Sequence, residues 1–274
     1  MFLKNLKMYG LVFLVFTIGM FCLFPQAFGQ FSSLEKEDMM IITKSEKISD
    51  VEFDGKWTTV TEWKHSSLTQ LQYDDSKKIM VKSAHSGDYI YVLIDFQNDY
   101  TLDNISDKST ICFDSKNNQS NIFDEDDYCF TVSLGQKQGN IFRGGGSFPL
   151  NSHLEQIKNE NYISVSSKSD INNRFSKNIH PVYEFKIPIE LLGRSDNYGF
   201  FISVYEATSN TYYNWPMEVN RENSKIPSPE LWGNIISPDK SLPEFHIPLL
   251  IVISGLLAMI IFSRKFSFSK IYRI

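Results

Sequence analysis

Residues 78–96 read KIMVKSAHSGDYIYVLIDF, and this stretch decides the fold class. The segments 78–83 and 89–96 are rich in β-branched and aromatic side chains, which favour strands. Between them, His85-Ser86-Gly87-Asp88 has the composition of a tight hairpin turn. We therefore predict a β-hairpin at this place in the chain.

The same pattern continues along the chain. Further strands are expected at Thr110–Asp114, Tyr128–Leu134, Asn140–Arg143, Tyr162–Ser166, Val182–Ile187 and Tyr198–Tyr205. A single short helical turn is expected at 189–193, ended by a glycine. No long amphipathic helix is predicted between the terminal segments, and turn residues separate the strands at intervals typical of sandwiches and barrels. The predicted fold class is mainly β.

The N-terminal segment has the layout of a secretory signal peptide. Lys4 and Lys7 precede the apolar run Leu11–Phe24, and Ala27-Phe28-Gly29 places small residues at the spacing that a signal peptidase needs. We predict a signal peptide over residues 1–29. An uncleaved membrane anchor is the alternative, less favoured because the apolar run is short and Pro25 ends it.

The C-terminal residues 242–274 are predicted to be a membrane anchor or a sorting signal. The apolar run Ile247–Phe262 is followed by Arg264 and Lys265, and such cations mark the cytoplasmic side, so the preceding domain would face outward. Pro243-Glu244-Phe245, the apolar run and the basic tail together resemble the PEF-type sorting signals of archaeal surface proteins, which archaeosortases are thought to process. An ordinary single-pass transmembrane helix is equally compatible with these residues.

One folded domain is expected between the two ends. Residues 30–50 are polar and fit a linker or a first edge strand, and residues 51–241 have the size of a single β-rich domain. The chain has 27 Lys+Arg against 32 Asp+Glu, a net charge of −5. Several of the cations lie in the terminal segments, so the domain itself is more acidic, which argues against nucleic acid and anionic lipid as partners.

The cysteines indicate an oxidising compartment. Cys22 would leave with the signal peptide, so Cys112 and Cys129 remain as an even pair in two segments that are predicted to be neighbouring strands. A disulfide between them would stabilise the fold by about 3 kcal/mol through loop closure. Two buried free thiols are the alternative.

A carboxylate-rich connection follows the first of these strands. Asp114, Asp124, Asp126 and Asp127, with Glu125 beside them, offer the oxygen ligands that Ca²⁺ prefers. The spacing does not match an EF-hand loop, because no glycine stands where its sharp turn would fall. A solvated acidic loop remains the alternative to a calcium site.

Aromatic side chains are the candidates for ligand binding, because the C–H faces of sugars pack on aromatic rings while polar neighbours bind the hydroxyls. The candidates are Trp215, Tyr213, Tyr212, Trp232 and Trp63. Residues 212–216 are expected to form the most exposed cluster, and Trp57 is expected in the core. The alternative for each tryptophan is a core position, the usual one in a β-sandwich.

Patterns typical of catalysis are missing. The five histidines have neither His-x-His nor His-Glu-x-x-His spacing, so zinc is not expected. No Gly-x-Ser-x-Gly or Cys-x-x-Cys-His sequence occurs, so we expect neither an esterase-type nucleophile nor an attached haem. Paired glycosidase carboxylates cannot be recognised from spacing alone. We predict a non-catalytic protein, which could serve as an accessory module to glycoside hydrolysis.

A family resemblance rests on short motifs in a fixed order. They are Phe53-Asp54-Gly55-Lys56-Trp57, Glu62-Trp63, the strand Tyr89–Asp95, Ile111-Cys112-Phe113-Asp114, Tyr183-Glu184-Phe185-Lys186-Ile187-Pro188 and Trp232-Gly233. Over residues 51–236 this order resembles the family 9 carbohydrate-binding module and its DOMON-like relatives. The resemblance implies a single jelly-roll-like antiparallel β-sandwich, often with structural calcium, that binds sugars in some members and haem or other ligands in others.

The resulting hypothesis is a non-catalytic binding module for a glycan or cell-envelope polysaccharide on the extracellular face of the membrane. Its C-terminal helix would tether it to the membrane, where a sortase-like enzyme could process it. The alternatives are a structural or adhesive envelope protein without a small-molecule ligand and a haem-binding redox domain. An exposed aromatic patch would favour the first hypothesis, buried tryptophans the second, and an apolar cavity with a facing Met or His the third.

Overall fold

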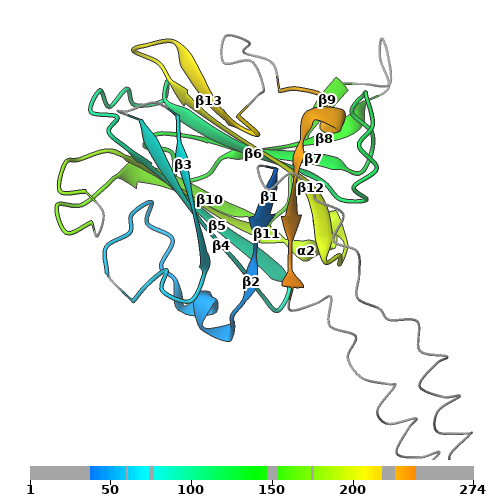
Figure 1. Ribbon diagram of the computed structural model, residues 1–274, viewed down its shortest axis with the longest axis horizontal. Coiled ribbons are helices and arrows are strands. Elements are labelled where there is room, and N and C mark those ends of the chain that lie inside the picture. Colours follow the sequence, from blue (N-terminus) through cyan, green and yellow to red (C-terminus); the bar gives the residue numbers. More distant parts are fainter. Residues whose placement is uncertain are drawn as a thin grey trace, which may run out of the picture. The chain divides into compact units, whose positions relative to one another are not determined.

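The computed structural model describes residues 38–59, 61–73, 77–146, 153–173, 176–217 and 226–238. These residues form a mainly β structure in which two sheets make a sandwich-like arrangement (Figure 1). The predicted signal peptide and the predicted C-terminal anchor lie outside the described residues. Among the residues described, no helix has both the length and the apolar character to cross a membrane.

Sheet A has eight strands in the order β1-β14-β12-β6-β7-β8-β9, with β13 also paired to β12. Its strands are β1 (Met39–Ile41), β6 (Lys108–Asp114), β7 (Asp127–Ser133), β8 (Asn140–Gly146), β9 (His153–Ile157), β12 (Asn197–Glu206), β13 (Thr211–Trp215) and β14 (Gly233–Ile236).

Sheet B has six strands in the order β10-β11-β5-β4-β2, with β3 also paired to β4. Its strands are β2 (Thr43–Lys44), β3 (Ser67–Gln72), β4 (Lys78–Ser86), β5 (Tyr89–Gln97), β10 (Ile163–Lys168) and β11 (Pro181–Pro188). Three short helical turns complete the described elements: η1 (Glu46–Asp50), α2 (Ile189–Leu192) and η2 (Pro229–Leu231).

The hairpin predicted from residues 78–96 is confirmed as β4 and β5, which pair antiparallel with Ser86 opposite Tyr89. The six further predicted strands are confirmed as β6, β7, β8, β10, β11 and β12, and the predicted helical turn as α2. Strand β13 was not predicted, because Thr211–Trp215 lies in a stretch that we interpreted only as an aromatic cluster.

The expectation of a wholly antiparallel sandwich needs a correction. Strand β1 pairs parallel with β14, and β2 pairs parallel with β4. The cause is one extended segment that carries both β1 and β2 (Figure 1). Its first part lies at the edge of sheet A, beside β14, and its second part at the edge of sheet B, beside β4. The Ile42 N–H donates to the Ile236 carbonyl (2.9 Å) and the Ser45 N–H to the His85 carbonyl (3.0 Å). The segment therefore connects the edges of both sheets.

The main core lies between the sheets. Alternate side chains of the central strands point inward and are fully buried, as expected for a period of two. Phe113 is a centre of this core, with ring centroids 6.2 Å from Phe130, 5.9 Å from Tyr198 and 4.8 Å from Phe200. Aromatic side chains of sheet A therefore fill much of the space between the sheets.

A second apolar cluster covers the outer face of sheet B. Ile48, Val51, Trp57 and Trp63, from the segment before β3, pack on sheet residues that include Leu93. Beneath this layer, the buried Glu184 of β11 accepts two hydrogen bonds: the Gly55 N–H donates to Oε2 (2.8 Å), and the Trp63 Nε1–H donates to Oε1 (3.1 Å). Three motifs that are far apart in the sequence therefore meet at one carboxyl group.

Substitution of Gly55 tests how closely this layer packs on β10 of sheet B. Its φ of 78° is left-handed, and a Cβ there would lie 2.5 Å from the Ser167 backbone nitrogen. Gly87 is a matched control, since its φ is 56° but a Cβ would meet nothing within 4 Å. We expect Gly87→Ala to cost about 1 kcal/mol of unfolding free energy and Gly55→Ala clearly more, measured by denaturant unfolding. Equal costs would contradict the close approach of the loop to β10.

Glu184 makes stability depend on pH. Burial raises its pKa well above the ordinary value of 4.5, against the two N–H donors, which lower it. The native state thus keeps a proton that the unfolded state releases, so the unfolding free energy should fall as pH rises above about 4.5. We expect Glu184→Gln to flatten part of this decline when unfolding is measured across pH 4 to 8. An unchanged slope would mean that Glu184 is ionised in the native state.

Candidate ligand-binding groove

The outer face of sheet A carries a groove built from alternate residues of its central strands. Tyr205 of β12 lies directly opposite Tyr212 of β13, and Ser203 lies opposite Asn214. On the other side of β12, Lys108 of β6 lies opposite Tyr205. Because side chains alternate between the two faces of a strand, all of these side chains project away from the main core.

The groove is a hollow of about 200 Å³. It is lined by Lys108, Thr110, Thr131, Phe142, Phe201, Ser203, Tyr205, Tyr212, Asn214 and Ile226. Small-molecule pockets usually begin at about 300 Å³, so we expect this hollow to take one sugar-sized unit rather than a buried oligosaccharide.

Two tyrosines form the aromatic wall of the groove. The ring centroids of Tyr205 and Tyr212 are 4.5 Å apart at an interplanar angle of 33°, and both side chains are half-buried. The Tyr205 hydroxyl donates to Asn210 Oδ1 (2.9 Å), which fixes its ring. Lys108 Nζ lies 5.3 Å from the centre of the Tyr205 ring. The wall is therefore held in place and has a cation beside it.

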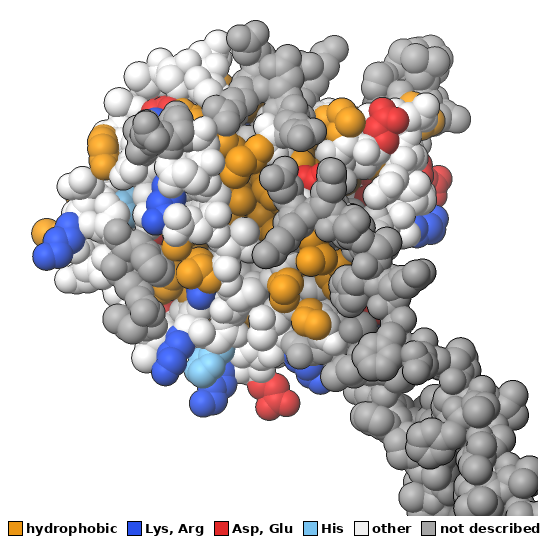
Figure 2. All heavy atoms as spheres, in the orientation of Figure 1, with side chains coloured by type: hydrophobic (Ala, Val, Ile, Leu, Met, Phe, Trp, Pro, Cys, Tyr) orange, Lys and Arg blue, Asp and Glu red, His pale blue; other side chains and the backbone are white. Residues whose placement is uncertain are grey.

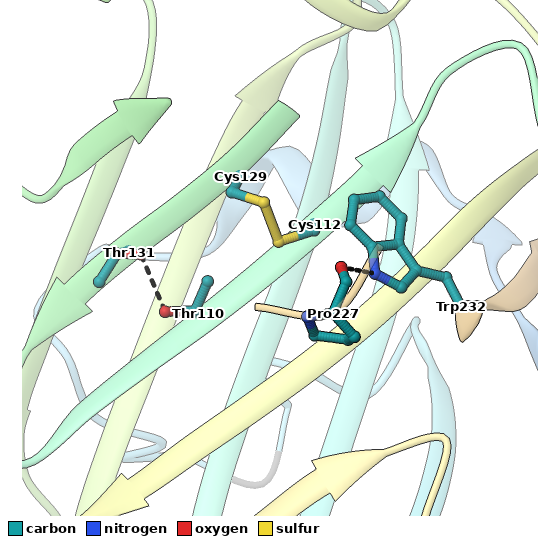
Figure 3. The surroundings of a disulfide bond; sticks show 6 residues. All are labelled: Thr110, Cys112, Cys129, Thr131, Pro227 and Trp232. Carbon is teal, nitrogen blue, oxygen red and sulfur yellow. Dashed lines mark hydrogen bonds between the residues drawn. A yellow bond between two sulfur atoms is a disulfide. The ribbon is translucent and has the colours of Figure 1, made fainter. Parts of the chain in front are cut away.

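Hydroxyl groups and a disulfide lie along the other strands of this face. The Thr110 and Thr131 hydroxyls are hydrogen-bonded to each other at 2.9 Å. Next along β6 and β7, Cys112 and Cys129 form the predicted disulfide (Figure 3). The disulfide links directly opposite residues of β6 and β7, so it holds together the two strands that present these threonines.

Trp232 supports the groove from the side, next to Phe201. Its ring stacks on that of Phe201 with centroids 6.2 Å apart, and its Nε1–H donates to the Pro227 carbonyl (3.0 Å), as Figure 3 shows beside the disulfide. It is buried with Phe201 and both cysteines in a small cluster on the outside of sheet A. Trp232 therefore positions Phe201 and presents little ring surface of its own.

The predicted ligand residues do not come together at one site. Tyr212 lines the groove, whereas Tyr213 and Trp215 point from the same strand into the main core, with exposed fractions of 5% and 3%. Trp63 has an exposed fraction of 0% and lies on the outside of sheet B. Ligand binding by the three buried residues stays a prediction without a geometric basis, because none has an open ring face.

Sequence reasoning missed Tyr205, Lys108, Thr110 and Thr131 as groove residues. The available signal was the period of two: Thr110 and Thr131 stand two residues before and after a predicted disulfide cysteine. The pairing partner of each strand was the missing information. Without it, the alternation alone could not show that these side chains share one face.

The acidic loop between β6 and β7 offers an incomplete cation site. Asp114 and Asp127 are fully buried and lie opposite each other in the strand register. Within the described residues, one carboxylate oxygen of each and Oδ1 of Asn117 have no hydrogen-bond partner. Burial raises the pKa of Asp127 to about 7, against a hydrogen bond from the Asp124 N–H. Lys116 pairs with Asp126 at 2.9 Å. Three orphaned oxygens fit a hard cation, yet no group of three metal-binding side chains is assembled among the described residues.

Two other hollows are less suited to stacking a sugar. One, of about 450 Å³, is lined mainly by carboxylates and threonines and has no Phe, Tyr or Trp side chain. The other, of about 420 Å³, has a single tyrosine, Tyr89, and is lined by the charged residues Asp88, Glu190 and Arg194. In Figure 2, hydrophobic side chains form separate patches on the visible face, with charged side chains mostly toward its margin.

Comparison with known proteins gives structural neighbours only. No family model matches the chain, and no curated protein matches it. The chain is similar to a family 9 carbohydrate-binding module from Caldicellulosiruptor kristjanssonii in complex with cellotriose, with 14% identity, 76% of this chain and 99% of that chain covered, and a TM-score of 0.48. It is also similar to a family 9 carbohydrate-binding module from Caldicellulosiruptor kristjanssonii in complex with glucose, with 13% identity, 73% of this chain and 95% of that chain covered, and a TM-score of 0.46. At this level of likeness, neither structure assigns a ligand or a site to this chain.

Proposed function

We propose that this protein is a non-catalytic carbohydrate-binding module that holds a sugar unit in the groove on the outer face of sheet A. The observation that carries the proposal is the half-buried pair of Tyr205 and Tyr212 beside hydroxyl and amide side chains. Aromatic rings pack against the C–H face of a pyranose. The hydroxyls of Thr110, Thr131 and Ser203 can exchange hydrogen bonds with those of the sugar.

The proposed location is the outer surface of the cell. The Cys112–Cys129 disulfide supports an exported domain, because disulfides persist in oxidising compartments. Residues 1–29 would direct export, and residues 242–274 would tether the domain to the membrane or be processed by a sortase-like enzyme. The glycan partner would then be part of the cell envelope or an external polysaccharide.

A structural or adhesive role is the second candidate. All four tryptophans are buried, with exposed fractions of 2% for Trp57, 0% for Trp63, 3% for Trp215 and 4% for Trp232. Their large apolar surfaces stabilise the sandwich and its two covering layers rather than a ligand. If the tyrosine groove binds no sugar, the same structure serves as a stable envelope domain.

The test of the groove is Tyr212→Ala. We expect the full chain, purified in a detergent without a sugar headgroup, to bind a subset of glycans on an array and in calorimetry. Loss of the Tyr212 ring should weaken binding about fivefold or more, since stacking of this kind contributes about 1 kcal/mol. Tyr100→Ala is the matched control, because Tyr100 is exposed and lies outside the groove.

Unfolding curves should show that both variants remain folded. Glycan binding that Tyr212→Ala leaves intact would place the site elsewhere. Absence of glycan binding by the wild-type chain would favour the structural role. Trp215→Ala would be a poor test, because removal of a core indole destabilises the whole fold.

We also propose that Asp114 and Asp127 hold calcium, completed by Asn117 and by backbone or water oxygens. The orphaned oxygens of these residues support the proposal, because buried carboxylate oxygens are costly without a partner. A bound cation would join β6 and β7 at the end of the pair, beyond the disulfide. Calcium would then have a structural role near the groove.

Calcium at millimolar concentration should raise the melting temperature above that measured in chelator, because a ligand bound only by the native state stabilises it. Asp127→Asn should abolish this rise. Glu160→Gln is the control, since Glu160 is an exposed carboxylate outside the loop. A wild-type melting temperature that is insensitive to calcium would mean that a proton, rather than a metal ion, neutralises this pair.

A further inference from the structure

We infer that the groove selects an anionic glycan, one that carries a uronic carboxylate or a sulfate ester, and that Lys108 binds its charged group. The inference rests on the proposed function and names the ligand class of the same groove. It is based on the position of Lys108 in the groove, on its positive charge, and on its lack of an ion pair among the described residues.

Of the ten described residues that line the groove, Lys108 is the one with a formal charge. The other nine are aromatic, aliphatic, hydroxyl-bearing or amide side chains. The whole chain has a net charge of −5, so a positive site stands out on an acidic protein. A surface of this kind attracts an anion locally, whatever the net charge of the molecule.

Among the described residues, no carboxylate forms an ion pair with the ammonium of Lys108. Within the described parts of the chain, the ion pairs of the other cations include Lys77 with Glu206, Lys116 with Asp126 and Arg143 with Glu125. Lys108 forms none with a carboxylate of those parts, and the contact recorded for its ammonium is with the Tyr205 ring, at 5.3 Å from the centroid. A half-buried cation that lies beside an aromatic ring retains the capacity to bind an anion.

The strand register places the charge of Lys108 next to the aromatic wall formed by Tyr205 and Tyr212. Lys108 is opposite Tyr205, and Tyr205 is opposite Tyr212, so the three side chains form one row across β6, β12 and β13. Thr110 and Ser203 form the next row on the same face. A pyranose stacked on the tyrosines would therefore have its hydroxyls near the second row and a charged substituent within reach of Lys108.

An ammonium prefers such a ligand over a neutral one. A charge-assisted hydrogen bond from Nζ to a carboxylate or sulfate oxygen is about twice as strong as a neutral hydrogen bond. A neutral sugar would cover the ammonium without pairing it, which is unfavourable for a charge that loses water. The groove therefore discriminates between anionic and neutral glycans by whether they pair one half-buried charge.

The test compares oligogalacturonate, a sulfated glycan and a neutral cello-oligosaccharide on the full chain by calorimetry. We expect the wild type to bind an anionic glycan at least about tenfold more tightly than the neutral one, with affinity falling as salt is raised. Lys108→Gln should lose that advantage and the salt dependence, and Lys108→Arg should keep both. Lys186→Gln is the matched control, because Lys186 also lies over a tyrosine ring but outside the groove.

The outcomes separate this inference from the proposed function. Binding of neutral glycans alone, or an anionic preference that survives in Lys108→Gln, would overturn the inference while the groove still binds sugar. Absence of binding to all three glycans would overturn both. Binding of only one of the two anionic glycans supports the inference and identifies the charged group as carboxylate or sulfate.

Discussion

The buried carboxyl group of Glu184 is the constraint on which the arrangement of this domain depends. It accepts hydrogen bonds from the Gly55 N–H and the Trp63 indole, so the segment before β3 is fixed over the outer face of sheet B. That segment buries Trp57 and Trp63 and converts one face of the sandwich into a second core. A ligand cannot use a face that the protein itself has covered. The proposed ligand site therefore lies on the outside of sheet A.

The outer face of sheet A carries the groove, and specific contacts hold the strands of this face in place. Strands β6 and β7 are joined by the Cys112–Cys129 disulfide, and Trp232 covers that bond and Phe201. These contacts stabilise the floor beside the groove without filling it. The half-buried tyrosine pair and the hydrogen-bonded threonines therefore line the groove from a rigid support, which would reduce the entropy that ligand binding costs.

Strand β13 contributes side chains both to the groove and to the main core. Tyr212 and Asn214 face the groove, whereas Tyr213 and Trp215 face the main core. A shift of register by one residue would exchange the two sets and place the indole outside. The pairing of Tyr205 with Tyr212 thus decides both which aromatic residues stabilise the core and which line the groove.

The sequence by itself determined the mainly β class, six of the later strands, the first hairpin and the disulfide pair, because these follow from local composition, period and cysteine count. It also identified the motifs around Gly55, Trp63 and Glu184, but not that they meet. Only the tertiary structure decided which tryptophans are buried, which strands lie side by side, and that Lys108 stands beside two tyrosines. The physical reason is that alternation along a strand defines two faces but not which one is covered, and that choice depends on partners far away in the chain.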